Sequence, residues 1–314
     1  MRYAVCISGA LRGDLNNLSN IYLNICEPLN ADVFLTTWDH HYKWAGILNL
    51  SSYTAKRYFG TKISEMIPPE YRTYEKIRDE FPLTFEKLSK SIINPVSTHE
   101  IINYIPSIKK LEILNEEAVT EFINSYFSDY LELYQTDKKV NQFKMFALMY
   151  LCDNSLSSYE KLNNFKYDIV IHIRPDYSIS NKIDFSYINT INDNQIMARS
   201  LFCGIDDVMF ICKRQTMISV CSIWEKMLLV KRLSPFKLFY NTDSHFLLLL
   251  WCISKGIKHL HDNSRGIFDC DQDFLYKGVS PYFPAFHELL MDIQNSSHRE
   301  QYCNLEKYIK SQLF

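Results

Sequence analysis

The sequence lacks the long apolar runs of a membrane protein. The apolar run FLLLLW at 246–251 is far below the roughly twenty residues that a membrane-spanning helix needs. The stretch MRYAVCISGA at the amino terminus has the pattern of a strand and a turn, and its apolar run is too short for a secretion signal. We therefore expect a cytoplasmic protein. Peripheral association with the inner face of a membrane stays compatible with the sequence.

An excess of positive charge is also missing. The chain of 314 residues has 34 Lys and Arg against 36 Asp and Glu, a formal net charge of −2, whereas broad nucleic-acid binding usually requires a basic excess. The nine cysteines are odd in number and scattered, and they include no C-x-x-C pair. We interpret them as reduced, mostly buried thiols in a cytosolic protein, and we expect no nucleic-acid partner.

Several catalytic and binding motifs are absent. The chain has no G-x-x-x-x-G-K-[ST] loop and no G-x-G-x-x-G fingerprint. No motif therefore supports the hypothesis of an ATPase or of a dehydrogenase. A serine hydrolase would need a G-x-S-x-G elbow, which is missing. The acidic run DCDQD at 269–273 lacks the glycine of a calcium loop because Phe274 occupies that position. The paired histidines at 40–41 and the pair His259 and His261 have no zinc-like spacing to further ligands.

Buried strands alternate with helices along most of the chain. The run RYAVCI at 2–7 is followed by an amphipathic helix and then by a second apolar run at 31–37, which predicts a β-α-β unit with parallel strands. A long helix at 139–163 leads directly into the strand YDIVIHI. Further strands are expected at 195–200, 207–213 and 257–261, and further helices at 215–230 and 242–255. The pattern predicts one α/β domain over 1–314 with a mostly parallel central sheet.

The range 40–138 has a weaker signal. Tyrosines, lysines and five prolines break it into short amphipathic stretches, with one candidate strand at 109–114. We expect a helical insertion or lid within the domain.

Polar residues follow three of the expected strands at their carboxyl ends, where ligands bind in open α/β sheets. The first strand ends in Ser8-Gly9, with Arg12 shortly after, and glycine lets a backbone approach a ligand while arginine suits phosphate. The second strand ends near Trp38 and Asp39. A turn with a solvated arginine would explain the first group equally well.

The third strand ends in Arg174-Pro175-Asp176. The proline fixes φ and stiffens the turn between the two charges. Asp176 could hold a divalent metal on a diphosphate, and Arg174 could neutralise phosphate charge. The alternative is a structural ion pair that closes the strand.

Other polar residues are candidates for the site, and each has a strong structural alternative. Asp206 and Asp207 precede a strand, where Asp206 could be a turn residue. Thr242, Asp243 and His245 lie at the start of a helix, where capping is the expected role.

Four stretches in this order, AVCISGALRG, ADVFLTTWD, NQFKMFALMYLC and YDIVIHIRPDY, resemble bacterial glycosyltransferases of the WavE type and related surface-polysaccharide enzymes. The similarity covers about the first 40 residues and the region from about 140 to 215. The resemblance implies a GT-A-like, Rossmann-like fold, a nucleotide-sugar donor and a glycan acceptor. By position, it implies a donor site lined by Ser8, Gly9, Arg12, Trp38, Asp39 and Gln142, with Arg174 and Asp176 at the diphosphate.

Two departures from that pattern affect the expected donor site. Ala10 stands where related sequences often have Gln, and His172 stands where a second arginine is common. The single aspartate of the Arg-Pro-Asp turn leaves a manganese or magnesium ion at Asp176 open beside a metal-independent mechanism that uses Arg12 and Arg174. The run HIRPD also resembles fucosyltransferases of a two-domain architecture, but with a proline in place of the second arginine and one residue fewer.

The expected function is transfer of a sugar from a nucleotide-sugar donor to a hydroxyl of a lipopolysaccharide or capsule. An inverting enzyme needs a carboxylate base, for which Asp243 is the first candidate and Asp207 the second. The alternatives are a non-catalytic nucleotide- or carbohydrate-binding protein, a fucosyltransferase-like enzyme and a transferase of another phosphate-linked group.

Overall fold

The computed structural model describes residues 1–13, 15–44, 46, 55–128, 137–177, 179, 185, 188–201, 204–230, 244–261 and 283–313. The chain divides into two compact units. The first consists of residues 1–11, 15–40 and 96–270, and the second consists of residues 12–14, 41–95 and 271–314. Within the described residues, no helix is both long and apolar enough to cross a membrane.

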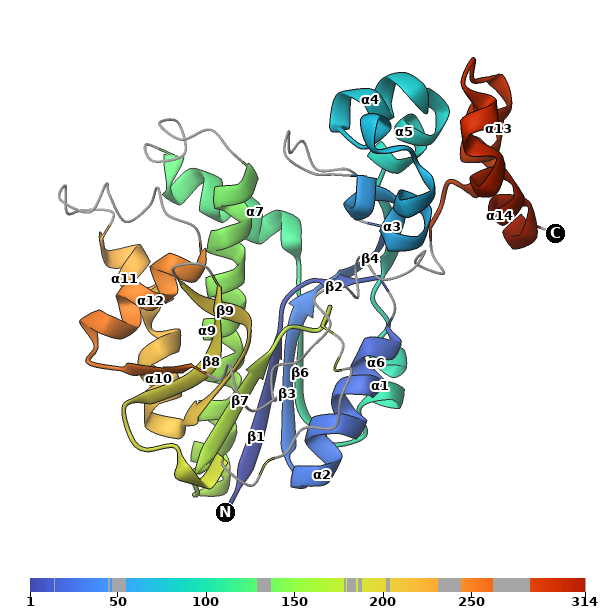
Figure 1. Ribbon diagram of the computed structural model, residues 1–314. Coiled ribbons are helices and arrows are strands. Elements are labelled where there is room, and N and C mark those ends of the chain that lie inside the picture. The colour runs from blue at the N-terminus through green and yellow to red at the C-terminus, as the bar shows by residue number, and fades with distance from the viewer. Residues whose placement is uncertain are drawn as a thin grey trace. The chain divides into compact units, whose positions relative to one another are not determined.

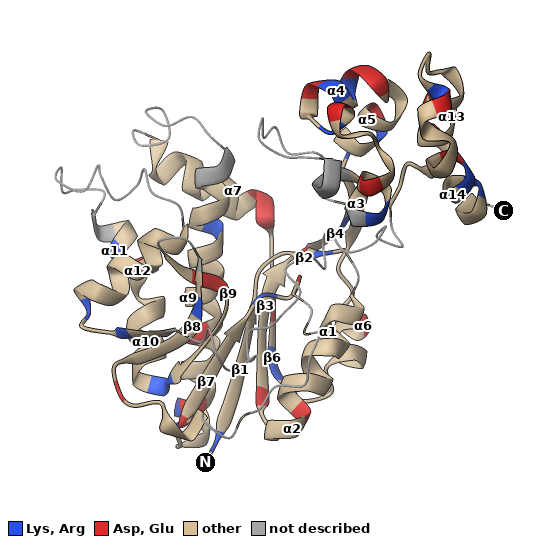
Figure 2. Cartoon of the chain, in the orientation of Figure 1, with Lys and Arg blue, Asp and Glu red and all other residues tan. Residues whose placement is uncertain are grey.

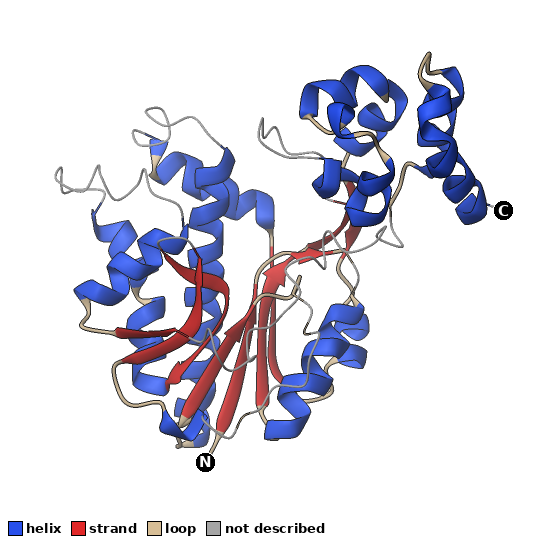
Figure 3. Cartoon of the chain, viewed as in Figure 1, coloured by secondary structure: helices blue, strands red, loops and turns tan. Residues whose placement is uncertain are grey.

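The first unit is built on a seven-stranded sheet of order β10-β8-β9-β7-β1-β3-β6 (Figures 1 and 3). Every pair of neighbours is parallel except those that involve β9, which runs antiparallel to β7 and to β8. The α/β class and the mostly parallel sheet predicted from the sequence are therefore confirmed. The strands are β1 (Tyr3–Ser8), β3 (Asp32–Trp38), β6 (Ile108–Leu114), β7 (Ile169–Ile173), β8 (Gln195–Leu201), β9 (Gly204–Lys213) and β10 (Lys258–His261).

Helices cover both faces of this sheet (Figure 1). One face carries α1 (Asn16–Ile21), a π-helical turn (Tyr22–Cys26), α2 (Glu27–Leu29) and α6 (Thr98–Tyr104). The other carries α7 (Glu116–Tyr126), α9 (Asp137–Asn163), α10 (Arg214–Cys221), α11 (Ile223–Val230) and α12 (Ser244–Ser254). A 3-10 turn (Ile188–Thr190) precedes β8.

Burial on both faces explains why the inner strands are continuously apolar. Along β1, Ala4 and Cys6 pack in the core under α9, whereas Val5 and Ile7 pack in the core under α1. The long helix predicted at 139–163 matches α9. The single helix predicted at 215–230 is instead two helices, because the chain turns at Ser222, whose hydroxyl donates to the Ser219 carbonyl.

A buried ion cluster joins α10 to α9 at the edge of the sheet where β9 ends. The Arg214 guanidinium donates to Asp153 at 2.6 Å, to Glu160 at 3.0 Å and to Ser157 at 2.7 Å. Burial alone would lower the pKa of Arg214, but the two carboxylates raise it. The cluster holds α10 against α9 at the edge of the sheet where the parallel strands begin.

The second unit has a three-stranded sheet of order β2-β4-β5 and a helical core. Its strands are β2 (Leu11–Arg12), β4 (His40–Trp44) and β5 (Ile92–Pro95), and the first residues of β2 and β4 belong to the first unit. Its helical segments are α3 (Ala55–Met66), a 3-10 turn (Pro69–Tyr71), α4 (Tyr74–Glu80), α5 (Pro82–Ser89), α13 (Phe286–Asn295), a second 3-10 turn (Arg299–Tyr302) and α14 (Cys303–Leu313).

Asp292 of α13 caps the amino terminus of α5. Its carboxylate accepts hydrogen bonds from the backbone N–H groups of Leu83 and Thr84 and from the Thr84 hydroxyl. These bonds satisfy donors that a helix start leaves unpaired. They join segments that lie 209 residues apart in the chain within one unit.

The range 40–138, expected as one insertion, is divided between the two units. Residues 41–95 belong to the second unit together with the carboxyl-terminal helices, whereas α6, β6 and α7 belong to the first. The candidate strand at 109–114 lies within β6, an edge strand of the seven-stranded sheet.

Candidate functional site

The candidate site lies at the carboxyl edge of β1 and β7. The strand order reverses at β1, because β3 and β6 follow on one side and β7 lies on the other. At such a point the connections after the two neighbouring strands diverge, and ligands of α/β proteins bind there. Because β9 is antiparallel to β7, the beginning of β9 reaches this same edge.

Polar side chains lie at the carboxyl end of the sheet face that packs under α9. Ser8 lies in register with Thr36 of β3, and the Ser8 hydroxyl is 2.9 Å from Nε2 of His172 on β7. His172 is 1% exposed, and its ring stacks on Phe210 with centroids 4.6 Å apart. Burial, together with the nearby charge of Arg174, lowers the pKa of His172 to about 3. His172 is therefore a neutral histidine under the site.

The loop after β1 touches the Arg-Pro-Asp turn after β7. Gly9 has φ +144°, and a β-carbon placed on it would lie 3.0 Å from Cδ of Pro175 and 3.8 Å from Cγ of Arg174. A side chain at this position would thus be strained in the backbone and crowded by the turn. Glycine permits the close approach of the two segments that the sequence placed at one sheet edge.

Arg174 and Asp176 form a bidentate ion pair. The Nε atom of Arg174 is 2.9 Å from Oδ1 of Asp176, and Nη2 is 2.6 Å from Oδ2. The Asp176 side chain is 4% exposed and that of Arg174 26% exposed. The Asp176 carboxylate and, more weakly, that of Asp207 raise the pKa of Arg174. The guanidinium is a permanent positive charge held at the sheet edge by Asp176.

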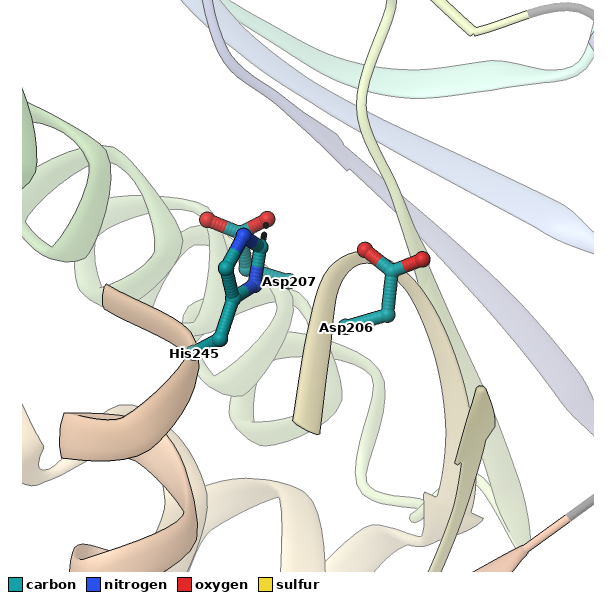
Figure 4. Close-up of side chains that lie close together, drawn as sticks. All are labelled: Asp206, Asp207 and His245. Atoms are coloured by element: carbon teal, nitrogen blue, oxygen red, sulfur yellow. Dashed lines mark ion pairs between the residues drawn. The ribbon is translucent and has the colours of Figure 1, made fainter. Parts of the chain in front are cut away.

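Asp206, Asp207 and His245 meet beside this pair (Figure 4). Nδ1 of His245, near the start of α12, is 3.5 Å from Oδ1 of Asp207, which is 3.9 Å from Nη1 of Arg174. Asp206 accepts from Arg199 Nε at 3.1 Å and from the Val208 N–H at 3.1 Å, and its burial raises its pKa. Figure 2 shows acidic colour at the start of β9, at the carboxyl edge of the parallel strands.

The ligand-type atoms of Asp206, Asp207 and His245 lie within 4.8 Å of one another, the spacing that a bound cation would require. Their partners do not fit a cation. Asp206 binds Arg199 and a backbone N–H, Asp207 faces Arg174, and Nδ1 of His245 faces two oxygen atoms. Asp176, expected as a metal ligand, is bonded by both oxygens to Arg174. Neither oxygen of Asp176 is therefore open to a manganese or magnesium ion in this arrangement.

Trp38 and Asp39 lie at the end of β3, where they join a different network. Trp38 is 2% exposed and contributes to the core rather than to a surface. Asp39 accepts from Asn115 at 2.7 Å and contacts His40 at 2.8 Å. Although burial would raise the pKa of Asp39, hydrogen bonds from His40, Glu116 N–H and Asn115 lower it. Glu116 connects the network to Lys144 of α9 at 2.8 Å.

The remaining predicted residues are dispersed. Gln142 lies in the first half of α9, one helical turn before Phe146, which packs in the core under α9. Arg12 is on β2 and belongs to the second unit. Asp243 lies outside the described residues, so its expected role as a base stays a prediction.

Three polar atoms of these strand ends are buried without a hydrogen-bond partner among the described residues: Thr36 Oγ1, His172 Nδ1 and Asp207 Oδ1. Gln142 Nε2, on α9, is likewise without one. Buried polar groups are nearly always paired, so unpaired ones require a reason. A polar ligand at the sheet edge is one such reason.

From the sequence, His245 was a candidate at a helix start where capping was the expected role, and Arg199 was not a candidate. Each is brought there by pairing with a β9 carboxylate, Asp207 for His245 and Asp206 for Arg199. The local signals available were the pair of aspartates at the strand start and a histidine in the first turn of a helix. Neither signal shows that the two segments meet.

No protein-family model matches the chain, and a search of curated proteins finds no match.

Proposed function

We propose that the chain is a glycosyltransferase that moves a sugar from a nucleotide-sugar donor to a hydroxyl of a bacterial surface glycan, lipopolysaccharide or capsule. The observation that carries this proposal is the set of buried polar groups with unpaired atoms at the strand-order reversal, beside a guanidinium that is 26% exposed. A diphosphate offers the negative charge and acceptor oxygens that such a guanidinium binds.

The sheet supports the same proposal. The sheet is mostly parallel, Ser8-Gly9 stands at the end of β1, and Arg-Pro-Asp follows β7, the fourth strand of the sheet in chain order. This arrangement is compatible with the GT-A-like fold that the sequence resemblance implies. A two-domain enzyme of the fucosyltransferase kind would have a second parallel sheet. In the described part of the chain, the second unit has only three short strands and a helical core.

In this proposal Arg174 binds the diphosphate and offsets the charge that develops on it as the bond to the sugar breaks. Asp176 acts through Arg174, because the bidentate pair fixes the plane of the guanidinium. Gly9 lets the backbone after β1 approach the same group. The neutral His172 holds Ser8 without adding positive charge.

The proposal predicts nucleotide binding that depends on Arg174. Thermal shifts with UDP, GDP, CDP and CMP identify the nucleotide, and release of free nucleotide from a panel of nucleotide sugars identifies the donor. Arg174→Gln should weaken binding of the matching nucleoside diphosphate roughly 10- to 100-fold, since a hydrogen bond to a charged group contributes about 1.5–3 kcal/mol.

Arg78→Gln is the matched control, because Arg78 is an exposed arginine of α4 that pairs with its neighbour Asp79. It should bind nucleotide like the original chain. If no nucleotide raises the melting temperature and no donor is cleaved, the proposal is wrong. Binding without release of nucleotide would instead indicate a non-catalytic nucleotide-binding protein.

A further inference from the structure

His245 is held in a fixed orientation at the start of α12. A β-carbon on Gly204 would lie 2.4–2.6 Å from atoms of His245, so the strand backbone packs directly against the histidine. The side chain, 28% exposed, points its Nδ1 atom at the Ile205 carbonyl oxygen, 3.2 Å away, and at Oδ1 of Asp207, 3.5 Å away. Figure 4 shows the ring beside the Asp207 carboxylate.

These two contacts determine which ring nitrogen carries the proton. A carbonyl oxygen can only accept a hydrogen bond, and so can an ionised carboxylate. Nδ1 must therefore be the protonated nitrogen of the neutral ring. Nε2 is left with its lone pair, which is the state of a general base.

Asp207 is placed to stabilise the ring once Nε2 takes up a proton. Its side chain is 4% exposed, and its Oδ1 atom has no hydrogen-bond partner among the described residues. A buried carboxylate next to Nδ1 favours the imidazolium and keeps the ring oriented. This is the arrangement of a base and the group that orients it.

Asp207 also connects the histidine to the proposed diphosphate site, because Oδ1 lies 3.9 Å from Nη1 of Arg174. The Asp207 carboxylate thus faces both His245 and Arg174, the residue proposed to bind the diphosphate. A sugar bound between them would have its leaving group and its attacking nucleophile on residues of one cluster.

We propose that His245 is the general base of the sugar transfer, with Asp207 as the residue that positions it; this inference rests on the proposed function. Nε2 of His245 takes the proton of the acceptor hydroxyl. The electron pair of that oxygen forms the new bond to the anomeric carbon, while the bond from this carbon to the diphosphate breaks and its electron pair leaves on the diphosphate oxygen. Arg174 offsets the charge on the leaving group, and the imidazolium later loses its proton to water.

Charged groups from several elements face His245. Asp206 and Asp207 of β9 are nearest, and Arg174 and Arg199 lie behind them as their partners. Farther along α12, the Trp251 indole donates to the Ser219 carbonyl of α10, and His259 of β10 bonds to the Ala198 carbonyl. Asp207 is therefore the charged group that faces the ring nitrogen Nδ1 most directly.

The test uses the donor identified by nucleotide release, with water as the acceptor. His245→Ala should lower the rate of release about a hundredfold to ten-thousandfold, the usual contribution of a general base, and should leave nucleoside diphosphate affinity within about twofold. Added imidazole should restore part of the rate. His245→Gln keeps a donor for the Ile205 carbonyl, and its residual activity should lose the acid limb of the pH–rate profile.

Asp207→Asn should lower the rate less than His245→Ala does and should move the acid limb, because the ring loses its negative neighbour. His99→Ala, an exposed histidine of α6 that contacts Asn103, is the control for loss of an imidazole and should match the original chain. Release within fivefold of the original rate in both His245 variants, or an unchanged acid limb in His245→Gln, would overturn the assignment. Absence of cleavage in the original chain would overturn the proposed function instead.

Discussion

His172 is a histidine that the fold keeps uncharged. Its ring stacks on Phe210, its Nε2 atom meets the Ser8 hydroxyl, and its pKa is lowered to about 3 by burial and by Arg174. The usual value in an unfolded chain is 6.5. Between these two values the unfolded chain binds a proton that the folded chain does not bind.

We therefore expect the free energy of unfolding to fall as pH decreases from 6.5 toward 3, with His172 contributing up to about 1.4 kcal/mol per pH unit. His172→Gln should be less stable at pH 7 and should lack this component of the slope. Urea unfolding at pH 7, 6 and 5 measures both effects, since most carboxylates stay ionised in this range. His99→Gln, exposed, should keep the original slope; an equal slope in His172→Gln would contradict the prediction.

At the scale of the element, the sequence predicted those strands and helices whose pattern is local. Burial on both faces makes β1, β3 and β7 continuous apolar runs, and their limits differ from the predicted ones by a residue or two. The separation of α10 from α11 was missed because no glycine or proline marks the turn at Ser222. The place of β6 was missed because its two lysines and its glutamate are typical of a strand at a sheet edge, which gives no information about the sheet that the strand joins.

The site was predictable to the same extent. Ser8, Gly9, Arg174 and Asp176 follow strands whose ends had to meet if the strands are parallel, and the structure brings the two segments together. The meeting of Asp207 with His245 depends on an antiparallel strand and on a helix almost forty residues later in the chain. No local pattern contains that information.

The junction of β9 and α12 has no room for a side chain at Gly204. Gly204→Ala would place a methyl group within 2.4–2.6 Å of the His245 backbone and side chain, so α12 would have to move. We expect a loss of about 1–3 kcal/mol in the free energy of unfolding, the cost of overpacking, together with reduced donor cleavage. Chemical denaturation and nucleotide release measure the two effects.

Ser254→Ala, at the exposed end of the same helix, is the control and should change neither quantity by much. If Gly204→Ala is as stable and as active as the original chain, the close packing of strand and helix is not essential to the site.

At the scale of the whole molecule, each unit has a core of its own. The first unit contains two apolar clusters, one on each face of its sheet, and the second contains a cluster centred on residues such as Phe59, Phe81 and Tyr302. The Asp292 cap of α5 lies entirely in the second unit. A substitution of Asp292 should therefore destabilise mainly the second unit.

Asp292→Ala removes the acceptor of two backbone N–H groups and one hydroxyl, and we expect it to cost about 1–3 kcal/mol. Hydrogen exchange should accelerate in α5 and α13, while β1 and β7 keep their protection. Asp79→Ala, whose exposed carboxylate pairs with Arg78, is the control and should leave the exchange pattern unchanged. Equal acceleration in β1 and β7 would show that the units unfold together.

The hairpin between β8 and β9 carries residues of the candidate site and residues of the core on the same strand. Its return strand carries Asp206 and Asp207 at one end and Phe210 and Cys212, buried in the core, a few residues later. Because side chains alternate with a period of two, an insertion or deletion that shifts this strand by one residue turns the carboxylates and the core residues over together. A variant with such an insertion or deletion should therefore not be well folded and inactive. It loses its core packing and the position of its two carboxylates at the same time.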